Sequence, residues 1–110
     1  ARYAFREKMR TFFEEFDLLL TPTLPVAAFG TGLDVPPGYE DKNIVSWATY
    51  TYPFNLTGQP AASLPVGFTS KGLPVGLQLV ASAFDEKSIL SLAGAYETIF
   101  PERKKLRPAL

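Results

Sequence analysis

The fold is decided by two neighbouring stretches, Asn55-Leu56-Thr57-Gly58-Gln59-Pro60-Ala61-Ala62-Ser63-Leu64-Pro65-Val66-Gly67 and Gly72-Leu73-Pro74-Val75-Gly76-Leu77-Gln78-Leu79-Val80. In residues 63–68 and 75–80 apolar side chains recur at every second position, which is the period of a β-strand. Between them, Thr69-Ser70-Lys71-Gly72 has the composition of a tight turn. The two stretches therefore predict a β-hairpin.

Polar and glycine positions in these stretches carry further expectations. Gly58, Gly67 and Gly76 are expected where the backbone needs a positive φ or a close approach. Gln78 is expected to hydrogen-bond a neighbouring strand or loop, and Asn55 to satisfy backbone groups at a helix end. Direct contact of either amide with a substrate is the alternative.

The segment before the hairpin predicts a helix, a strand and a long loop. Residues 2–16 repeat apolar side chains at steps of three and four, from Phe5 to Phe16, which predicts a helix with one core-facing side. The apolar run Asp17–Thr21, bounded by proline, predicts a strand buried on both faces. Residues 26–39 are rich in Gly and Pro and predict a loop that is long enough to be functional or to cover a site.

Two more helices are expected on either side of the hairpin. Residues 42–55 include Ile44, Trp47 and Phe54 at helical spacing, although residues 49–52 intrinsically favour strands. We predict a helix that ends near Asn55 and is stopped by Gly58. Residues 85–100 predict a final helix with an acidic start and a proline stop.

The predicted order is helix, strand, long loop, helix, β-hairpin, helix. This order predicts an α/β fold of mixed α+β layers. The 110 residues suit one domain. Three strands make a thin sheet, and the chain starts without Met inside a predicted helix, so residues 1–110 are expected to be a partial domain of a longer parent.

Composition excludes several classes of function. With no Cys and no His, the chain has no disulfide, no Cys or His triad and no His metal ligand. Zero net charge argues against a nucleic-acid partner, and the basic cluster Arg103, Lys104, Lys105 and Arg107 is expected to be a solvated tail. No apolar run approaches membrane-span length, and residues 1–6 are amphipathic rather than apolar, which is not the pattern of a signal peptide. No membrane partner and a cytoplasmic location are therefore expected.

Motifs in a fixed order resemble the C-terminal end of the amidase signature family, the Ser-Ser-Lys amide hydrolases. The resemblance spans about the whole chain, and Asp85-Glu86-Lys87 resembles the start of the family's last helix. The other matching residues are Asp17-Leu18-Leu19-Leu20-Thr21-Pro22-Thr23, then Asn55, Gly58, Pro60 and Ala61, then Ser63, Pro65 and Gly67, and finally Gly72, Leu73, Pro74, Gly76 and Gln78.

The resemblance implies that the parent hydrolyses a small-molecule carboxylic amide to an acid and ammonia or an amine. In the family, a lysine and a second serine activate a serine nucleophile, and all three lie N-terminal to the matched segment. The resemblance therefore implies no catalytic residue and no metal or organic cofactor in this chain, and the isolated chain is expected to be inactive. Ser63 falls within a strand pattern and Lys71 within an exposed turn, so neither is expected to be catalytic.

The resemblance also implies that the helix before Asn55 lines the acyl side of the substrate pocket. The predicted substrate-binding residues are Trp47, Ala48, Thr51 and Tyr52. Amidotransferase members that act on glutamine carry an acidic residue about where Ala48 falls, yet here no carboxylate lies between residues 41 and 85. An apolar or aromatic amide therefore fits better, while packing of Trp47 in the core is the alternative.

Two other functions remain open alternatives. The chain could be a non-catalytic binding or assembly module that forms homo-oligomers through exposed sheet edges, because open edges invite pairing. It could also belong to the catalytic subunit of a tRNA-dependent amidotransferase, against which the missing acidic residue weighs.

Overall fold

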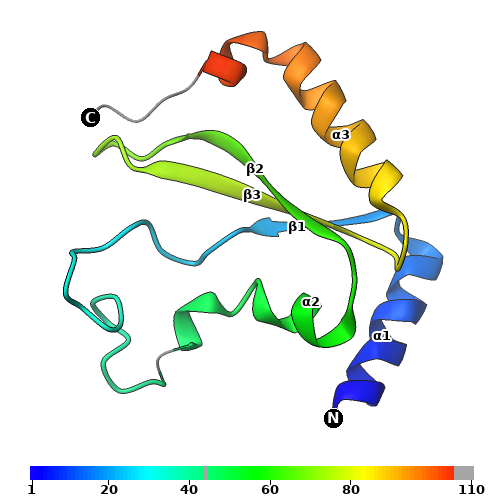
Figure 1. Ribbon diagram of the computed structural model, residues 1–110, viewed down its shortest axis with the longest axis horizontal. Coiled ribbons are helices and arrows are strands. Elements are labelled where there is room, and N and C mark those ends of the chain that lie inside the picture. The colour runs from blue at the N-terminus through cyan, green and yellow to red at the C-terminus, as the bar shows by residue number, and fades with distance from the viewer. Residues whose placement is uncertain (44, 106–110) are drawn as a thin grey trace.

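The computed structural model describes residues 1–43 and 45–105 and shows the expected mixture of helices and sheet (Figure 1). The predicted fold class is confirmed. The elements are α1 (Arg2–Glu15), β1 (Leu18–Pro22), η1 (Ser46–Ala48), α2 (Tyr52–Thr57), β2 (Ala61–Phe68), β3 (Pro74–Ala81), α3 (Glu86–Ile99) and η2 (Pro101–Lys105), where η denotes a 3-10 helix.

The sheet has three strands in the order β1-β3-β2, and both pairs are antiparallel. β2 and β3 form the predicted hairpin, with Ser63 opposite Gln78 and a bulge between Pro65 and Gly67. Pro65 lies in an edge strand, where the missing N–H of proline is tolerated. The central strand is β3, so β1 and β2 flank it although they are separated in sequence.

Helices cover both faces of the sheet, because successive residues of β3 point to opposite sides. On one face Val80 packs with Met9 of α1 and Phe54 of α2. On the other face Leu79 packs with Ile89 of α3. Figure 1 shows α3 on one side of the strands and α1 with α2 on the other.

The predicted helices at both ends of the chain are confirmed. Asp85 caps α3, because its carboxylate accepts hydrogen bonds from Ser88 N at 3.3 Å and from Ser88 Oγ at 2.6 Å. α1 ends at Glu15, one residue before the predicted end. Phe16 consequently lies outside the helix, stacks on Phe12 with ring centroids 4.8 Å apart, and is 47% exposed.

The expectation that the first strand is buried on both faces is wrong. β1 is an edge strand, and Leu20 is 51% exposed. Leu18 and Leu19 are partly buried against the cores on the two faces of the sheet. The strand is therefore less buried than its apolar composition suggests.

The predicted helix over 42–55 is also wrong. The structure has η1 over three residues and a separate six-residue α2, while Ile44 lies outside the described residues. Pro53 explains the break, because proline fits only the first turn of a helix, and it occupies that position in α2.

Gly58 does end α2, with a left-handed φ of 82° and its N–H bonded to Phe54 O at 2.8 Å. Asn55 is exposed within α2, while the predicted loop over 26–39 contains no helix or strand.

The basic cluster near the C-terminus is not wholly a solvated tail. Arg103 lies in η2, and its Nη1 donates to Val66 O at 2.6 Å beside the bulge of β2. A Cβ on Gly67 would lie 3.0 Å from the same nitrogen, so glycine makes room for the guanidinium. Lys104 and Lys105 also belong to η2, and Arg107 lies outside the described residues.

Candidate functional site

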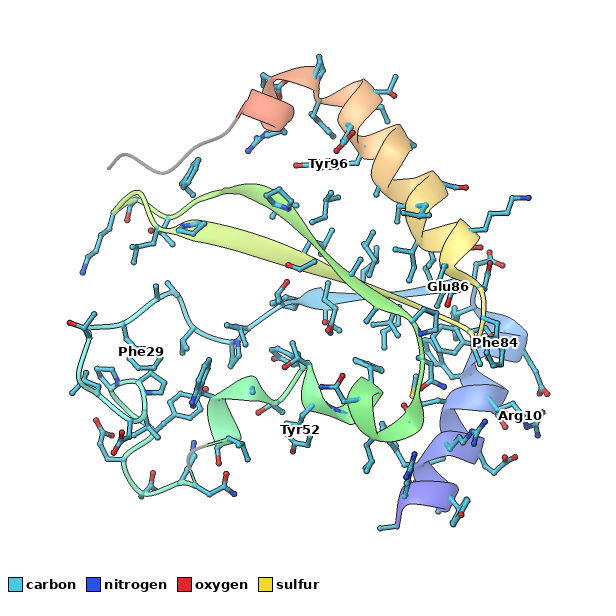
Figure 2. The ribbon with its side chains drawn as sticks, viewed as in Figure 1. Arg10, Phe29, Tyr52, Phe84, Glu86 and Tyr96 are labelled. Atoms are coloured by element: carbon cyan, nitrogen blue, oxygen red, sulfur yellow. The ribbon has the colours of Figure 1, made fainter. Side chains whose placement is uncertain are left out.

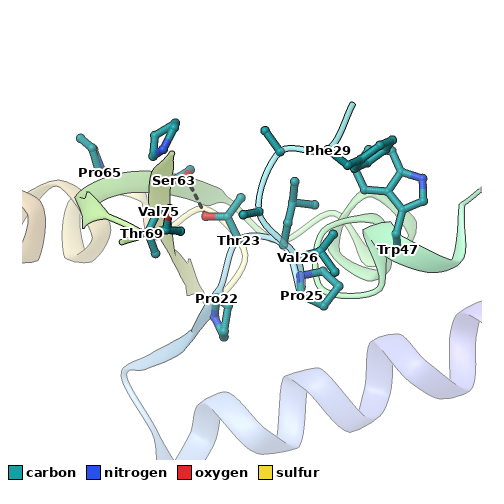
Figure 3. A pocket seen from close by; sticks show the side chains of 15 residues that line it. Pro22, Thr23, Pro25, Val26, Phe29, Trp47, Ser63, Pro65, Thr69 and Val75 are labelled. Carbon is teal, nitrogen blue, oxygen red and sulfur yellow. Dashed lines mark hydrogen bonds between the residues drawn. The ribbon is translucent and has the colours of Figure 1, made fainter. Parts of the chain in front are cut away.

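A cavity of about 750 Å³ lies beside the turn end of the hairpin (Figure 3). Three parts of the chain line it: the segment 22–29, which begins at the last residue of β1, Trp47 of η1, and the hairpin. None of the described residues that line it is charged. The hairpin contributes Ser63, Pro65, Thr69, Pro74, Val75 and Gly76.

The polar feature of this cavity is a pair of hydroxyl groups. Thr23 Oγ1 and Ser63 Oγ are 2.7 Å apart, as the dashed line in Figure 3 shows. We call this pair the hydroxyl bridge. The two residues lie on either side of β3 and meet over Gly76, where a Cβ would be 2.6 Å from Thr23 Oγ1 and 2.7 Å from Ser63 Oγ. The bridge therefore requires glycine at position 76, as the expected close approach implies.

An aromatic pair forms another part of the lining. The rings of Phe29 and Trp47 meet edge to face, with centroids 5.6 Å apart and planes at 84°. Trp47 Nε1 is buried and has no hydrogen-bond partner among the described residues. The indole of Trp47 therefore contributes apolar surface to the cavity, while its N–H makes no hydrogen bond to the described residues.

Gln78 holds η1 in place next to the cavity. Its side chain is buried on β3, and Nε2 donates to Thr21 Oγ1 at 2.9 Å and to Tyr50 O at 2.7 Å. The expectation that Gln78 hydrogen-bonds a neighbouring strand and loop is confirmed. Because Tyr50 follows η1 closely, this contact fixes the segment that carries Trp47.

The structure brings one of the four predicted substrate-binding residues into the cavity lining. Trp47 lines it, whereas Ala48, Thr51 and Tyr52 are not among the lining residues. Ala48 O accepts a bond from Thr51 Oγ1 at 3.1 Å, and Tyr52 is 48% exposed and points away from the sheet (Figure 2). Substrate contact by any of the four remains a prediction.

Sequence reasoning did not assign Thr23 and Phe29 to the site and considered Ser63 only as a nucleophile. The signal for Thr23 was available in the Pro22-Thr23 motif, but its partner lies 40 residues away. Sequence spacing does not report contacts at that separation.

Neither Ser63 nor Lys71 has the surroundings of a catalytic residue. Ser63 shares its hydrogen bond with Thr23, and Lys71 is exposed in the hairpin turn. A serine hydroxyl needs a base to become a strong nucleophile. Within residues 1–43 and 45–105, no group of three or more His, Cys, Asp or Glu side chains could hold a metal ion. What the cavity offers a ligand is apolar surface and the two hydroxyl groups of Thr23 and Ser63.

Comparison with known proteins identifies the family. The family model described as Amidase matches residues 1–90. The chain belongs to the amidase signature family. A bacterial aryl acylamidase described as a member of that family shares 28% of its sequence with this chain, with a TM-score of 0.70 over 98% of this chain and 24% of that one.

Relatives of this amidase family chain include amidotransferase subunits and a hydrolase. A glutamyl-tRNA(Gln) amidotransferase subunit of Myxococcus xanthus is 44% identical over 87% of this chain and 19% of its own length. The structure of the corresponding subunit from Thermotoga maritima has a TM-score of 0.74 at 34% identity, covering 87% of this chain and 20% of that one. For 6-aminohexanoate cyclic dimer hydrolase the TM-score is 0.74 at 31% identity, covering 97% and 24%. The chain thus spans about a fifth of the length of the curated relatives it matches.

The helices in the described part of the chain can be compared with the length and apolar character of a membrane span. None of its helices combines the length and the apolar character needed to cross a bilayer.

Proposed function

We propose that this chain forms one wall of the substrate pocket of an amidase that hydrolyses a small-molecule carboxylic amide to an acid and ammonia or an amine. A serine oxygen bonds to the carbonyl carbon as the C–N bond breaks, and the amine leaves with the proton given up by that serine; water then hydrolyses the acyl-serine ester, which releases the acid and restores the serine hydroxyl. The nucleophile, the proton relay and the base of this reaction lie outside residues 1–110. The chain by itself binds and orients the substrate.

The uncharged cavity is the observation that carries this proposal. Its lining combines the Phe29–Trp47 pair with aliphatic side chains and the hydroxyl bridge. An apolar wall binds a ligand through burial of apolar surface, whereas a charged ligand loses hydration that these residues do not replace. A neutral amide with an apolar or aromatic acyl group is therefore the substrate class we propose.

A second candidate function is that of an amidotransferase component, which the 44% identity to the Myxococcus xanthus protein favours. The absence of an acidic residue between residues 41 and 85 argues against a substrate with a free amino group. A glutamine-directed activity and an apolar-amide activity are separable by substrate choice.

The experiment reads the coding region upstream of residue 1 and expresses the complete gene product. Ammonia release is then measured from hexanamide, benzamide and glutamine, with the 110-residue chain as the control expected to be inactive. We expect a kcat/KM for a neutral apolar amide at least about tenfold above that for glutamine. Preference for glutamine would establish the amidotransferase function. Absence of a lysine and two serines upstream, with no hydrolysis, would leave a binding module.

Pocket variants connect this activity to the cavity. Trp47→Ala in the complete product is expected to lower kcat/KM for benzamide about tenfold, because it removes a large apolar contact. Leu90→Ala changes an exposed residue of α3 and serves as the control. Equal activities of the two variants would contradict a role of Trp47 in the pocket.

Self-association and location are further parts of the proposal. The exposed edges of β1 and β2 could pair with another copy, which sedimentation of the chain at high concentration tests. A monomer under those conditions would contradict edge pairing.

The cytoplasmic location remains a prediction, which cell fractionation would test.

A further inference from the structure

The hydroxyl bridge lies where three strands present one face to the cavity. Thr21 of β1 and Ser63 of β2 both lie opposite Gln78 of β3. The residues two positions further along, Thr23 and Pro65, therefore flank Gly76. Thr23 N donates to Gly76 O at 2.9 Å, which fixes the backbone of Thr23 against the strand. Both hydroxyls line the cavity, as Figure 3 shows. The bridge is therefore held in position before any ligand arrives.

The bridge keeps hydrogen-bonding capacity for a ligand. Each hydroxyl has one proton and two lone pairs, and the mutual bond uses one proton and one lone pair. One proton and several lone pairs remain for a further partner. Because either oxygen can be the donor, the pair can rotate to donate to a carbonyl oxygen or to accept from an N–H group.

The surroundings of the bridge decide which ligand suits it. Gly76, Pro65 and Val75 are its neighbours on the hairpin, and none of the described lining residues carries a charge. Ser63 is exposed and Thr23 is partly buried, so the ligand itself has to cover the bridge. Once it is covered, two neutral hydroxyls compensate poorly for the hydration that an ion loses. They compensate well for the hydration of one amide or hydroxyl group.

We propose that the hydroxyl bridge of Thr23 and Ser63 determines the specificity of this cavity. It binds a neutral hydrogen-bonding group, such as a carboxamide, carried on an apolar or aromatic body. It selects against carboxylates and cations of the same shape. The inference rests on the proposed function for the nature of the substrate, but ligand binding itself needs no hydrolysis.

The test uses the fluorescence of Trp47, which is the only tryptophan of the chain and lines the cavity. Circular dichroism first establishes that the 110-residue chain folds by itself, and the complete gene product, studied by calorimetry, replaces it if it does not. The folded protein is titrated with benzamide, benzoate and benzamidine, which have nearly the same shape but are neutral, anionic and cationic. We expect benzamide to bind at least about tenfold more tightly than either ion. Toluene, which has the aromatic ring without a hydrogen-bonding group, is the fourth ligand.

Variants of the bridge test its role directly. Thr23→Val keeps the shape and the backbone N–H but removes the hydroxyl, and it is expected to weaken benzamide binding about fivefold while leaving toluene binding unchanged. Ser63→Ala makes the same test from the other partner, should Thr23→Val fail to fold by circular dichroism. Thr98→Val is the matched control, because its hydroxyl bonds Gly94 O within α3.

Three results would overturn the inference: equal binding of benzamide and an ion, unchanged benzamide affinity in a folded bridge variant, or no saturable binding of benzamide. Failure here is distinguishable from failure of the proposed function. Amide hydrolysis by the complete gene product, with unaltered benzamide binding in Thr23→Val, would reject the bridge and keep the amidase. Selective benzamide binding without amide hydrolysis would keep the role of the bridge and reject the amidase function.

Discussion

The side-chain amide of Gln78 donates a hydrogen bond to the backbone carbonyl of Tyr50 at 2.7 Å, across 28 residues of sequence. The same nitrogen donates to Thr21 Oγ1 in β1. Gln78 is 4% exposed, so the donor side of both bonds is shielded from water. A single buried side chain of β3 thus joins the edge strand to the segment that places Trp47 at the cavity.

Replacing Gln78 should loosen this junction. Gln78→Leu removes both donated bonds and leaves Tyr50 O and Thr21 Oγ1 without them, so we expect a loss of about 1–3 kcal/mol in the free energy of unfolding. Urea unfolding followed by circular dichroism measures it. Asn55→Ala, an amide lost from an exposed helix position, should stay within about 0.5 kcal/mol. Equal stabilities of the two variants would show that the buried bonds contribute little.

Adding one methyl group at Gly76 should disrupt the hydroxyl bridge. The Cβ of Gly76→Ala would lie less than 3 Å from both hydroxyl oxygens, so the strands must shift. We expect a destabilisation of about 1–3 kcal/mol, typical of overpacking. Gly94→Ala is the control with the opposite sign, because nothing lies within 4 Å of its Cβ and alanine favours the helix by about 0.5–1 kcal/mol. A neutral Gly76→Ala in the same unfolding assay would contradict the close approach.

Removing the guanidinium of Arg103 should release η2 from β2. The side chain is 37% exposed, so the hydrogen bond from Arg103 Nη1 to Val66 O is partly screened by water. We expect Arg103→Ala to cost about 0.5–1 kcal/mol, measured by thermal unfolding. Lys71→Ala removes an exposed cation from the hairpin turn and should change the stability little. If both variants melt at the same temperature, the contact of Arg103 does not stabilise the fold.

The carboxylate of Glu40 provides a prediction about pH. Gly38 N donates to Glu40 Oε1 at 3.0 Å and to Oε2 at 2.8 Å, and this bonding lowers the pKa of Glu40 below its ordinary value. A lowered pKa in the folded state means that the bond stabilises the turn above the ordinary pKa of glutamate. That stabilisation is lost as pH falls through the lowered value.

An NMR titration of the Glu40 side chain and the Gly38 amide measures this pKa. Both resonances should change together, at a pH below that of an unperturbed glutamate, and Glu40→Gln should abolish the change at Gly38. A midpoint at or above the ordinary value would contradict the hydrogen bond.

The elements that were predicted correctly are those with a local signature. The alternation in residues 63–68 and 75–80 identified β2 and β3, and the helical period in residues 2–16 and 85–100 identified α1 and α3. The continuous helix predicted over 42–55 does not form, because the ring of Pro53 restricts this residue to the first turn of a helix and a new helix therefore begins there. The predicted solvated tail failed because no local pattern reveals that Arg103 meets Val66 O.

The sequence by itself determined α1, α3, the hairpin of β2 and β3, and the resemblance to the family, because each depends on residue types at short and fixed spacings. Only the tertiary structure decided that β1 pairs with β3 and that Thr23 meets Ser63 over Gly76. It also decided that Trp47 lines a cavity without charged groups among its described lining residues. The physical reason is that backbone periodicity reports how each segment packs, whereas contacts between distant segments depend on how the packed layers are arranged in space.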